Sequence, residues 1–515
     1  MAPTGLRQCM HDVTPYLITL MLVVTLGPLQ FGYHLAALNA PQDVLTCRKK
    51  TITAATKMLS KFPGRAAPEI PDCIPMTEAA FATVSSIFTL GGLVGALAAG
   101  PFCSSRGRLP AMRLTAIVYL IGSGIETIAT SVPIMAVGRT LTGVGAGAST
   151  VIVPLYISEI APPAERGFFG FFTQISVNVG ILLTQTLGYF LSYGSAWRWI
   201  LGTGVIIAAA QGTGLLVVPE SPAWLACQKG EVLRGRRILQ RIRGKDVSLD
   251  SEVAAWDGED GASAVAPAEE QGLLGSEDAL EVPTTPRSIS GSKSSVRSVG
   301  FWQVLGDPLY RPAIIAVVGI MFAQQLCGVN SIIMYSVSLL EDLLPMSSAL
   351  LTIIISGINL VTTIACSPLP DRLGRKTCIL LSIAGQGTSS LALALSIRFG
   401  VKILSAVSVL FFVAFFAVGL GPVPFMMASE LVGQEAVGAT QSWALGANYA
   451  ATFLVAQFFP IINVALNHRF GGAGWVYFLF AAFAAGFGLF VSAFVPETKG
   501  KKDADEVWGR TRRID

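Results

Sequence analysis

Three uncharged amide side chains lie close together in a segment that otherwise has the composition of a membrane-spanning helix. In the stretch "FAQQLCGVNSIIMYS", Gln324, Gln325 and Asn330 surround Gly328, and residues 312 to 340 carry no formal charge. An amide both donates and accepts hydrogen bonds, as the hydroxyls of a neutral ligand do, without the cost of burying a charge. Residues 325 and 330 would point about 140° apart on an ideal helix. A shared ligand therefore requires a local break, and Gly328 is a place for one.

The elements that must hold these amides are membrane helices. Of 515 residues, 52% are hydrophobic and 13% are charged, and mean hydropathy is +0.61. A soluble domain of this length needs more surface charge, and a bilayer core about 30 Å thick takes about 20 apolar residues per helix. We predict an all-α membrane protein with twelve spans at 14–38, 78–101, 111–130, 133–157, 168–191, 197–218, 311–340, 347–370, 377–398, 401–428, 436–463 and 473–495.

Short motifs recur at corresponding positions of two halves. "PLYISEIAPPAERG" at the fourth span matches "PFMMASELVGQEAVG" at the tenth, "PESPAW" matches "PETKG", and "SSRGRLP" matches "PDRLGRK". Two six-helix repeats of the same orientation place a substrate site at their interface near mid-membrane. We expect an N-terminal half (1–218), a helical linker (219–245), a disordered central loop (246–300), a C-terminal half (301–498) and a cytoplasmic tail (499–515).

Charged residues at the predicted helix ends could form a latch that is made in one conformation and broken in the other. Arginines there would reach acidic side chains and carbonyls of neighbouring helix ends. The candidate members are Arg106, Arg139, Glu159, Arg166, Glu220, Asp371, Arg372, Arg375, Glu430 and Glu497. The alternative is that the arginines are ordinary positive-inside topology charge.

With these motifs in order, the chain resembles the sugar porter branch of the major facilitator superfamily, especially the facilitative glucose transporters. The resemblance covers nearly all twelve spans. It rests on "LQFGYHLAALNAPQ", "GRTLTGVGAGASTVIVPLYISE", "PESPAWL", "QQLCGVN", "DRLGRK", "FFAVGLGPVPF" and "PETKG". It implies the major facilitator fold, with the linker forming a cytoplasmic helical bracket between the halves.

The resemblance also implies which residues bind the sugar. Amides also hydrogen-bond membrane helices to one another, but three around one glycine in a chain of this kind favour a ligand site. The implied substrate-binding residues are Gln174, Gln185, Gln324, Gln325, Asn330, Asn359, Phe425 and Asn448. Phe425 stands where many relatives have a tryptophan, and Tyr335 is implied near the outer gate.

Departures from the family pattern bear on energetics and on the latch. Proton-coupled relatives carry a carboxylate after "FGY" in the first helix, paired with an arginine of the fourth. Here Arg139 is present, but His34 takes the place of the carboxylate. Passive uniport is therefore expected, with His34 and Glu126 as the residues to suspect if protons are coupled. Ala417 replaces a glutamate of the family, and "SSRGR" lacks an acid, which implies an asymmetric latch.

The loops suggest an address and a partner. "EEQGLL" has the spacing of an acidic-dileucine sorting signal, with Glu269, Leu273 and Leu274. We expect a sorting adaptor as a partner and favour a vacuolar or endolysosomal membrane over the plasma membrane. Cys47 and Cys73 lie in the polar loop after the first span, and a disulfide between them is left open.

The resulting prediction is a multi-pass transporter that moves a hexose, glucose by preference, by alternating access. We expect no catalytic residues, metal, cofactor or nucleic acid, and a chain that functions as a monomer in the lipid bilayer. The alternatives are a proton-coupled sugar or polyol transporter and a sugar sensor that does not transport. The short tail after the last span favours transport over sensing.

Overall fold

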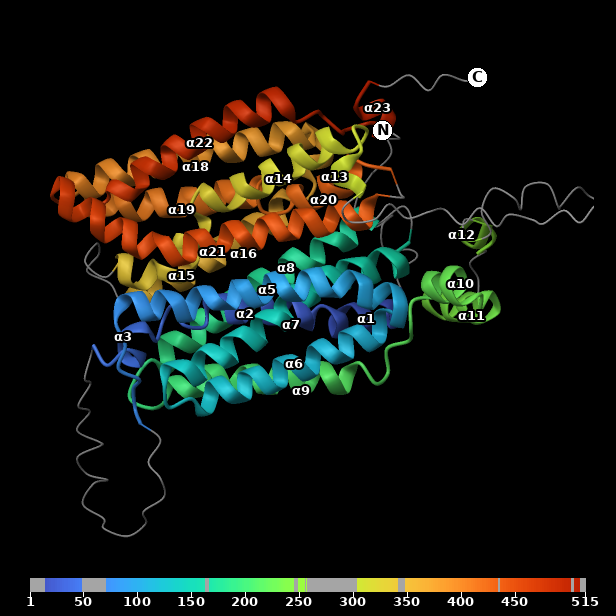
Figure 1. Cartoon of the computed structure of the whole chain (residues 1–515), viewed down its shortest axis with the longest axis horizontal. Coiled ribbons are helices and arrows are strands. Elements are labelled where there is room, and N and C mark those ends of the chain that lie inside the picture. The colour runs from blue at the N-terminus through green and yellow to red at the C-terminus, as the bar shows by residue number, and fades with distance from the viewer. Residues whose placement is uncertain are drawn as a thin grey trace, which may run out of the picture.

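The protein is described here by a computed structural model. It covers residues 14–48, 71–162, 166–244, 249–254, 256, 303–340, 348–433, 436–501 and 504–509. Within these residues the regular secondary structure is helical, and the long helices run side by side along the long axis of the molecule (Figure 1). This arrangement confirms the predicted all-α membrane fold.

The first half of the chain forms six spans. The first span is composed of two short helices in direct succession, and the other five are single helices. They are α1 (Pro15–Val24) with α2 (Leu26–Ala36), α5 (Glu78–Arg106), α6 (Arg108–Ile128), α7 (Val132–Ile160), α8 (Arg166–Leu191) and α9 (Trp197–Gly214), with the short α3 (Gln42–Leu45) after the first span.

Glycine allows two of these helices to pack with their backbones in contact. A Cβ placed on Gly147 of α7 would lie 1.8 Å from the carbonyl oxygen of Gly92 on α5. Because any side chain would be too large there, small residues are what permit this close approach of membrane helices.

The second half repeats the pattern with two broken spans. These are α14 (Arg311–Leu326) with α15 (Val329–Leu340), and α19 (Lys402–Val418) with α20 (Val423–Glu430). The unbroken spans are α16 (Ser348–Cys366), α18 (Arg375–Arg398), α21 (Val437–Phe470) and α22 (Trp475–Phe494), and the short helices are α13 (Gln303–Gly306), α17 (Leu369–Leu373) and α23 (Ala504–Val507).

Length and apolarity identify most of the predicted spans directly. In the part of the chain that the structure describes, nine helices are long and apolar enough to cross a membrane, and the bent pair of α14 and α15 is a tenth. Helices α8 and α9 occupy the predicted fifth and sixth positions and complete the two sets of six.

The predicted break at Gly328 is present. Helix α14 ends at Leu326, α15 begins at Val329, and the two are bent by 41°. Gly328 has a φ of +103°, and a Cβ at this residue would lie 2.7 Å from the Phe480 ring. Glycine is therefore required here both by conformation and by space.

The linker forms a helical bracket at one end of the bundle, composed of α10 (Pro222–Lys229) and α11 (Val232–Arg243) (Figure 1). The short α12 (Asp250–Ala254) packs with it, although it lies in the segment 246–300 that was expected to be disordered. Arg243 fastens α11 to the N-terminal half, because its Nη1 donates to the carbonyl of Ile160 at 2.6 Å. Its Nη2 lies 2.8 Å from Glu252 of α12. We call this the bracket end. The opposite end carries α3 (Figure 1) and a disulfide between Cys47 and Cys73, and we call it the disulfide end.

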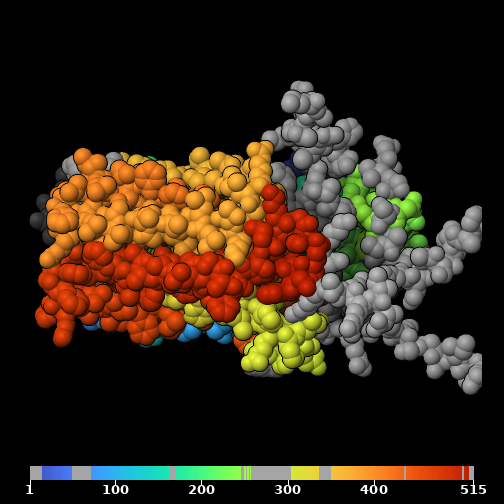
Figure 2. All heavy atoms as spheres, turned by 90° about the horizontal axis from the view of Figure 1, so that it is seen from above, coloured from blue at the N-terminus to red at the C-terminus, as the bar shows by residue number. Residues whose placement is uncertain are grey.

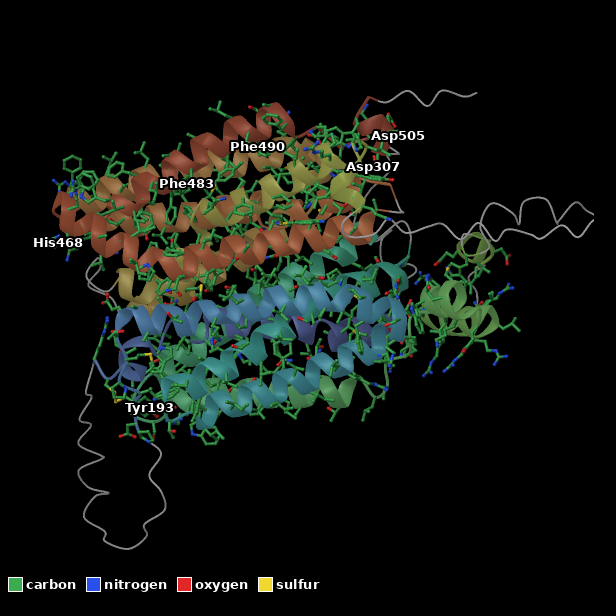
Figure 3. The ribbon with its side chains drawn as sticks, in the orientation of Figure 1. Tyr193, Asp307, His468, Phe483, Phe490 and Asp505 are labelled. Atoms are coloured by element: carbon green, nitrogen blue, oxygen red, sulfur yellow. A yellow bond between two sulfur atoms is a disulfide. The ribbon has the colours of Figure 1, made fainter. Side chains whose placement is uncertain are left out.

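The sides of the bundle are apolar, as a lipid-facing surface must be. Phe483 on α22 is 37% exposed and Leu489 is 73% exposed. Figure 3 shows Phe483 and Phe490 along one flank, Tyr193 and His468 at the disulfide end, and Asp307 and Asp505 at the bracket end. Seen from above, helices of the C-terminal half lie side by side, with part of the bracket beyond their end (Figure 2).

Candidate substrate site and its gates

The break in the seventh span joins the predicted amides into one hydrogen-bonded chain. Asn330 Nδ2 donates to Gln325 Oε1 at 2.5 Å, although the two residues would diverge on a straight helix. Gln325 Nε2 in turn donates to Gln324 Oε1 at 3.3 Å. All three side chains are at least 94% buried. The bend therefore brings Gln325 and Asn330 to one place, as the spacing predicted.

Two other spans of the C-terminal half complete this chain. Asn448 on α21 also donates to Gln324 Oε1, and Gln324 Nε2 donates to the Gly421 carbonyl at 3.0 Å, where α19 gives way to α20. Thr452, one turn beyond Asn448, lies 3.4 Å from Asn330 Nδ2. Gln324 thus links the breaks of the seventh and tenth spans directly, and Asn448 and Thr452 of the eleventh span join the same chain. Thr452 was not predicted, because a lone threonine in an apolar helix carries no motif.

The predicted amides of the fifth and eighth spans form a second polar group, between α8 and α16. Gln174 and Asn359 both hydrogen-bond to Asn178 Oδ1, at 3.3 and 3.4 Å. Gln185 accepts a hydrogen bond from Thr352 at 3.4 Å. Helix α8 belongs to the N-terminal half and α16 to the C-terminal half, so the bonds of Asn359 to Asn178 and of Thr352 to Gln185 cross between the halves.

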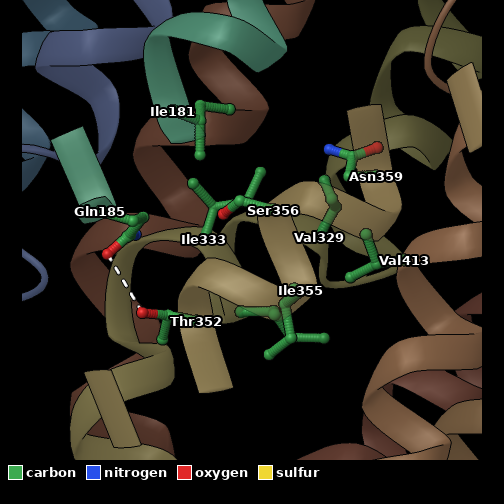
Figure 4. A pocket seen from close by; sticks show the side chains of 10 residues that line it. Ile181, Gln185, Val329, Ile333, Thr352, Ile355, Ser356, Asn359 and Val413 are labelled. Carbon is green, nitrogen blue, oxygen red and sulfur yellow. Dashed lines mark hydrogen bonds between the residues drawn. The ribbon is translucent and has the colours of Figure 1, made fainter. Parts of the chain in front are cut away.

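A pocket lies beside this second group. Its walls come from α8, α15, α16 and α19. Figure 4 shows Gln185 and Thr352 at one side of it and Asn359 at another. Of the eight predicted sugar-binding residues, Gln185 and Asn359 line this pocket. Gln324, Gln325, Asn330 and Asn448 form the amide chain just described, and α15 contributes to both places.

Two aromatic residues lie at the boundary between the halves. Phe425 is half-buried and packs against the cluster of Leu445 and Tyr449. The Tyr335 hydroxyl donates to the Ala456 carbonyl at 2.7 Å. Its ring lies 6.4 Å from that of Phe81 on α5.

The halves are in contact at the disulfide end. Asn39 Nδ2 donates to the carbonyl of Ile333 at 2.9 Å, and Ser86 donates to Gln457 Oε1 at 2.6 Å. Both bonds join the N-terminal half to the C-terminal half and lie on the same side of the amide chain as Tyr335. The structure is therefore one in which the two halves meet at the disulfide end.

The bracket end of the N-terminal half carries a cluster of charges that includes Arg108, which was not among the predicted latch residues. Arg108 makes the ion pair with Glu159, with Nη2 2.6 Å from Oε1. Arg106 is exposed at the end of α5. Glu220 accepts from the backbone N–H of Arg108 at 2.9 Å. Gly107 and Gly374 have φ of +101° and +103°, so they occupy equivalent positions, and Arg108 corresponds to Arg375 of the other half.

The C-terminal half repeats the same arrangement. Arg375 Nη2 lies 3.1 Å from Glu430 Oε1 and 3.0 Å from Asp371 Oδ1. Glu497 accepts from the backbone N–H of Arg375 at 2.7 Å. Asp371 has no counterpart in the sequence "SSRGR", so the two clusters differ by one acid, as the sequence implied. Arg372 contributes its carbonyl, which accepts from Lys499 Nζ at 2.6 Å.

Three fully buried ionisable residues meet inside the N-terminal half. Arg139 Nη1 donates to the His34 carbonyl at 2.8 Å and lies 4.0 Å from Glu126 Oε1. Thr142 donates to the same carboxylate oxygen at 2.6 Å, and His34 Nδ1 is 3.8 Å from Glu126 Oε2. Arg139 thus has a carboxylate beside it, from the third span and not from the first. Its place deep inside the half separates it from the bracket-end charges with which the sequence grouped it.

Other predicted features are settled or lie outside the description. Cys47 and Cys73 are joined by a disulfide. Arg166 is the first residue of α8, and its side chain lies outside the described residues. The same is true of the sorting segment with Glu269, Leu273 and Leu274.

Comparison with known proteins decides the family. A family model described as "Sugar (and other) transporter" matches residues 20–507. This chain belongs to the sugar transporter family. A probable metabolite transport protein of Saccharomyces cerevisiae is 34% identical to this transporter, over 98% of this chain and 97% of the relative.

Further relatives agree with this assignment. Vacuolar protein sorting-associated protein 73 of the same yeast is 31% identical, over 96% of each chain. Facilitated glucose transporter member 3 of Rattus norvegicus is 29% identical, over 96% of this chain and 92% of the relative. A structure of the xylose transporter XylE from E. coli covers 95% of this transporter and 100% of its own chain, with a TM-score of 0.71 at 22% identity. These matches confirm the resemblance to the sugar porters and the major facilitator fold. The family is one of transporters and not of enzymes.

Proposed function

We propose that this sugar transporter carries a hexose, glucose in the first instance, by facilitative uniport. The observation that supports the proposal is the amide chain from Asn448 through Gln324 and Gln325 to Asn330. Its members are buried and uncharged, and each can donate and accept. They can exchange their mutual hydrogen bonds for bonds to hydroxyls of a neutral ligand without exposing a charge to the membrane interior.

Uniport is favoured because His34, Glu126 and Arg139, the buried ionisable residues that meet inside the bundle, all belong to one half. Glu126 on α6 and Arg139 on α7 are both 0% exposed and compensate one another. Neither lines the pocket between α8 and α16. Phe88 covers the guanidinium at 4.6 Å. A charge pair closed within one half stabilises that half without having to change during the transport cycle.

Binding of D-glucose to the purified transporter tests the sugar site. We expect saturable binding of D-glucose and much weaker binding of L-glucose, since hydroxyls are recognised by directed hydrogen bonds. Replacement of Gln324 by leucine should weaken binding about tenfold or more, because it leaves Asn448 without its acceptor. Equal binding of both enantiomers, or an unchanged affinity in Gln324→Leu, would exclude the amide chain as the site.

Proton-coupled transport is the second candidate, and one observation favours it. Glu126 Oε2 and His34 Nδ1 are buried, face one another at 3.8 Å, and have no hydrogen-bond partner among the described residues. Protonation of His34 would convert this contact into an ion pair. A pH-sensitive dye inside sealed proteoliposomes would report protons that move when sugar is added. Sugar-evoked proton flux that is lost in Glu126→Gln would favour coupling over uniport.

We further propose that the transporter resides in a vacuolar or endolysosomal membrane. The acidic-dileucine spacing of Glu269, Leu273 and Leu274 and the name of the yeast relative, a vacuolar protein sorting-associated protein, support this address. A fluorescent fusion should label the vacuolar or lysosomal membrane. Substitution of both leucines by alanine should prevent adaptor binding and redirect the fusion to the cell surface. An unchanged location would show that this motif does not sort the protein.

A further inference from the structure

Asn178 lies at the contact between the halves, although no sequence motif marks it. It is on α8, one turn from Gln174, and is 1% exposed. Its Nδ2 donates to Thr363 Oγ1 of α16 at 2.8 Å, a good distance for such a bond. The Thr363 hydroxyl in turn donates to the carbonyl of Asn359, also at 2.8 Å. One side chain of the N-terminal half is therefore fixed to one helix of the C-terminal half.

The same side chain also contacts two residues that were predicted to bind sugar, one from each half. Asn178 Oδ1 accepts from Gln174 Nε2 at 3.3 Å and from Asn359 Nδ2 at 3.4 Å. These bonds are long and hence weak compared with the bond to Thr363. Asn359 Oδ1 is buried without a hydrogen-bond partner among the described residues. A ligand hydroxyl could therefore hydrogen-bond to Asn359 with the loss of only one weak bond, while the Asn178–Thr363 bond remains.

The bond between Asn178 and Thr363 lies on the bracket side of the pocket. Helix α8 runs from the bracket end toward the disulfide end, and α16 runs the opposite way (Figure 1). Asn178 therefore lies nearer the bracket end than Gln185, and Thr363 nearer than Thr352. The pocket wall includes Gln185 and Thr352, which hydrogen-bond at 3.4 Å. Two inter-half hydrogen bonds thus flank the pocket, and the one on the bracket side is the shorter.

We propose that Asn178 and Thr363 form the bracket-side gate of the transport pocket, with Asn178 as the positioning residue that links this gate to Gln174 and Asn359. Opening toward the bracket end separates α8 from α16 and breaks the bond. A sugar that hydrogen-bonds to Asn359 or Gln174 takes one donor away from Asn178 Oδ1. It thereby changes the free energy of opening the gate. The link to sugar rests on the proposed function, whereas the gate does not.

A cysteine in the pocket tests the gate without any sugar. The test uses the Ser356→Cys variant reconstituted in nanodiscs. A small charged thiol reagent modifies the cysteine introduced at position 356, and the rate of this modification is measured on the peptide that contains residue 356. Thr363→Val removes only the hydroxyl and should raise this rate about threefold to tenfold, the effect of losing one hydrogen bond on a two-state opening. The control is Thr362→Val on the same helix, which should leave the rate unchanged. Equal rates in Thr363→Val and its parent would overturn the gate.

A second pair of variants keeps the proposal testable if one protein is unstable. Asn178→Leu should raise the rate at least as much as Thr363→Val does, since it also removes the weak bond from Asn359. The double variant should match Asn178→Leu, because the bond between the two residues is already lost there. Additive effects would show that they act separately and would contradict the proposal. Thr363→Ser retains the hydroxyl and should restore the parent rate. Saturating D-glucose should change the rate in the parent and change it less in Asn178→Leu. A glucose response that is equal in both would overturn the link while leaving the gate result intact.

Discussion

Asn330 occupies the end of the amide chain, where a single substitution separates sugar binding from folding. Asn330→Val keeps a similar volume but leaves Gln325 Oε1 without its donor. We expect the dissociation constant for D-glucose to rise about tenfold, because a lost polar contact leaves a buried group unsatisfied. Isothermal titration measures this change. The matched control is Asn463→Val, an amide of α21 beyond the site, which should bind as the parent does; equal losses in both variants would mean that the substitution acts through the helix bundle.

Arg108 and Arg106 are two residues apart and should behave differently. Arg108 holds Glu159 by three hydrogen bonds, from Nε to both carboxylate oxygens and from Nη2 to one. Arg108→Gln breaks this pair and should change the rate of transport about threefold or more, since charge-assisted bonds are the stronger ones. Arg106→Gln should transport at the parent rate in the same vesicle assay. A larger effect of Arg106→Gln would support Arg106 as the latch residue and contradict this role for Arg108.

Which residues could be predicted depended on whether a motif carried them. The amides of "QQLCGVN" were identified because three polar residues in an uncharged span are conspicuous. Asn178 was not identified, since one amide among apolar residues is equally compatible with simple helix pairing. Its role depends on Thr363, which comes from a helix of the other half. No spacing within one helix contains that information.

At the scale of elements, the break at Gly328 is the feature on which the site depends. Gly328→Ala places a Cβ 2.7 Å from Phe480 at a φ of +103°. It should lower thermal stability and weaken D-glucose binding together, because the bend that joins Gln325 to Asn330 is disturbed.

The control for this substitution is Gly357→Ala, in the middle of α16. A Cβ there meets no atom within 4 Å, and alanine favours a helix over glycine by about 1 kcal/mol. Thermal unfolding in detergent should show a higher midpoint for Gly357→Ala and a lower one for Gly328→Ala. A Gly328→Ala protein with parent stability and parent affinity would show that the site does not need the break.

Elements were predicted more completely than their contacts. Length and apolarity placed the spans, and the repeated motifs divided them into two halves. The sequence also located the break in the seventh span, because polar side chains on divergent faces require one. It did not reveal that Glu126 of α6 reaches Arg139 of α7, since that contact depends on how two helices are rotated about their own axes.

At the scale of the whole molecule, the two halves meet on several levels. Near the disulfide end Asn39 and Ser86 bond to α15 and α21, and nearer the bracket end Asn178 bonds to α16. Each of these bonds is uncharged. Because such bonds contribute about 1 kcal/mol each, the halves can separate at either end at moderate cost. This is what alternating access by rocking of two halves requires.

The uptake of labelled D-glucose into sealed proteoliposomes tests the central claim most directly. The transporter is reconstituted with and without an imposed pH gradient, and the internal sugar concentration is followed to its final level. We predict saturable entry that stops at the external concentration in both conditions and is strongly slowed in Asn330→Val. Accumulation above the external concentration, driven by the gradient, would contradict uniport. Saturable binding without any entry would contradict transport itself.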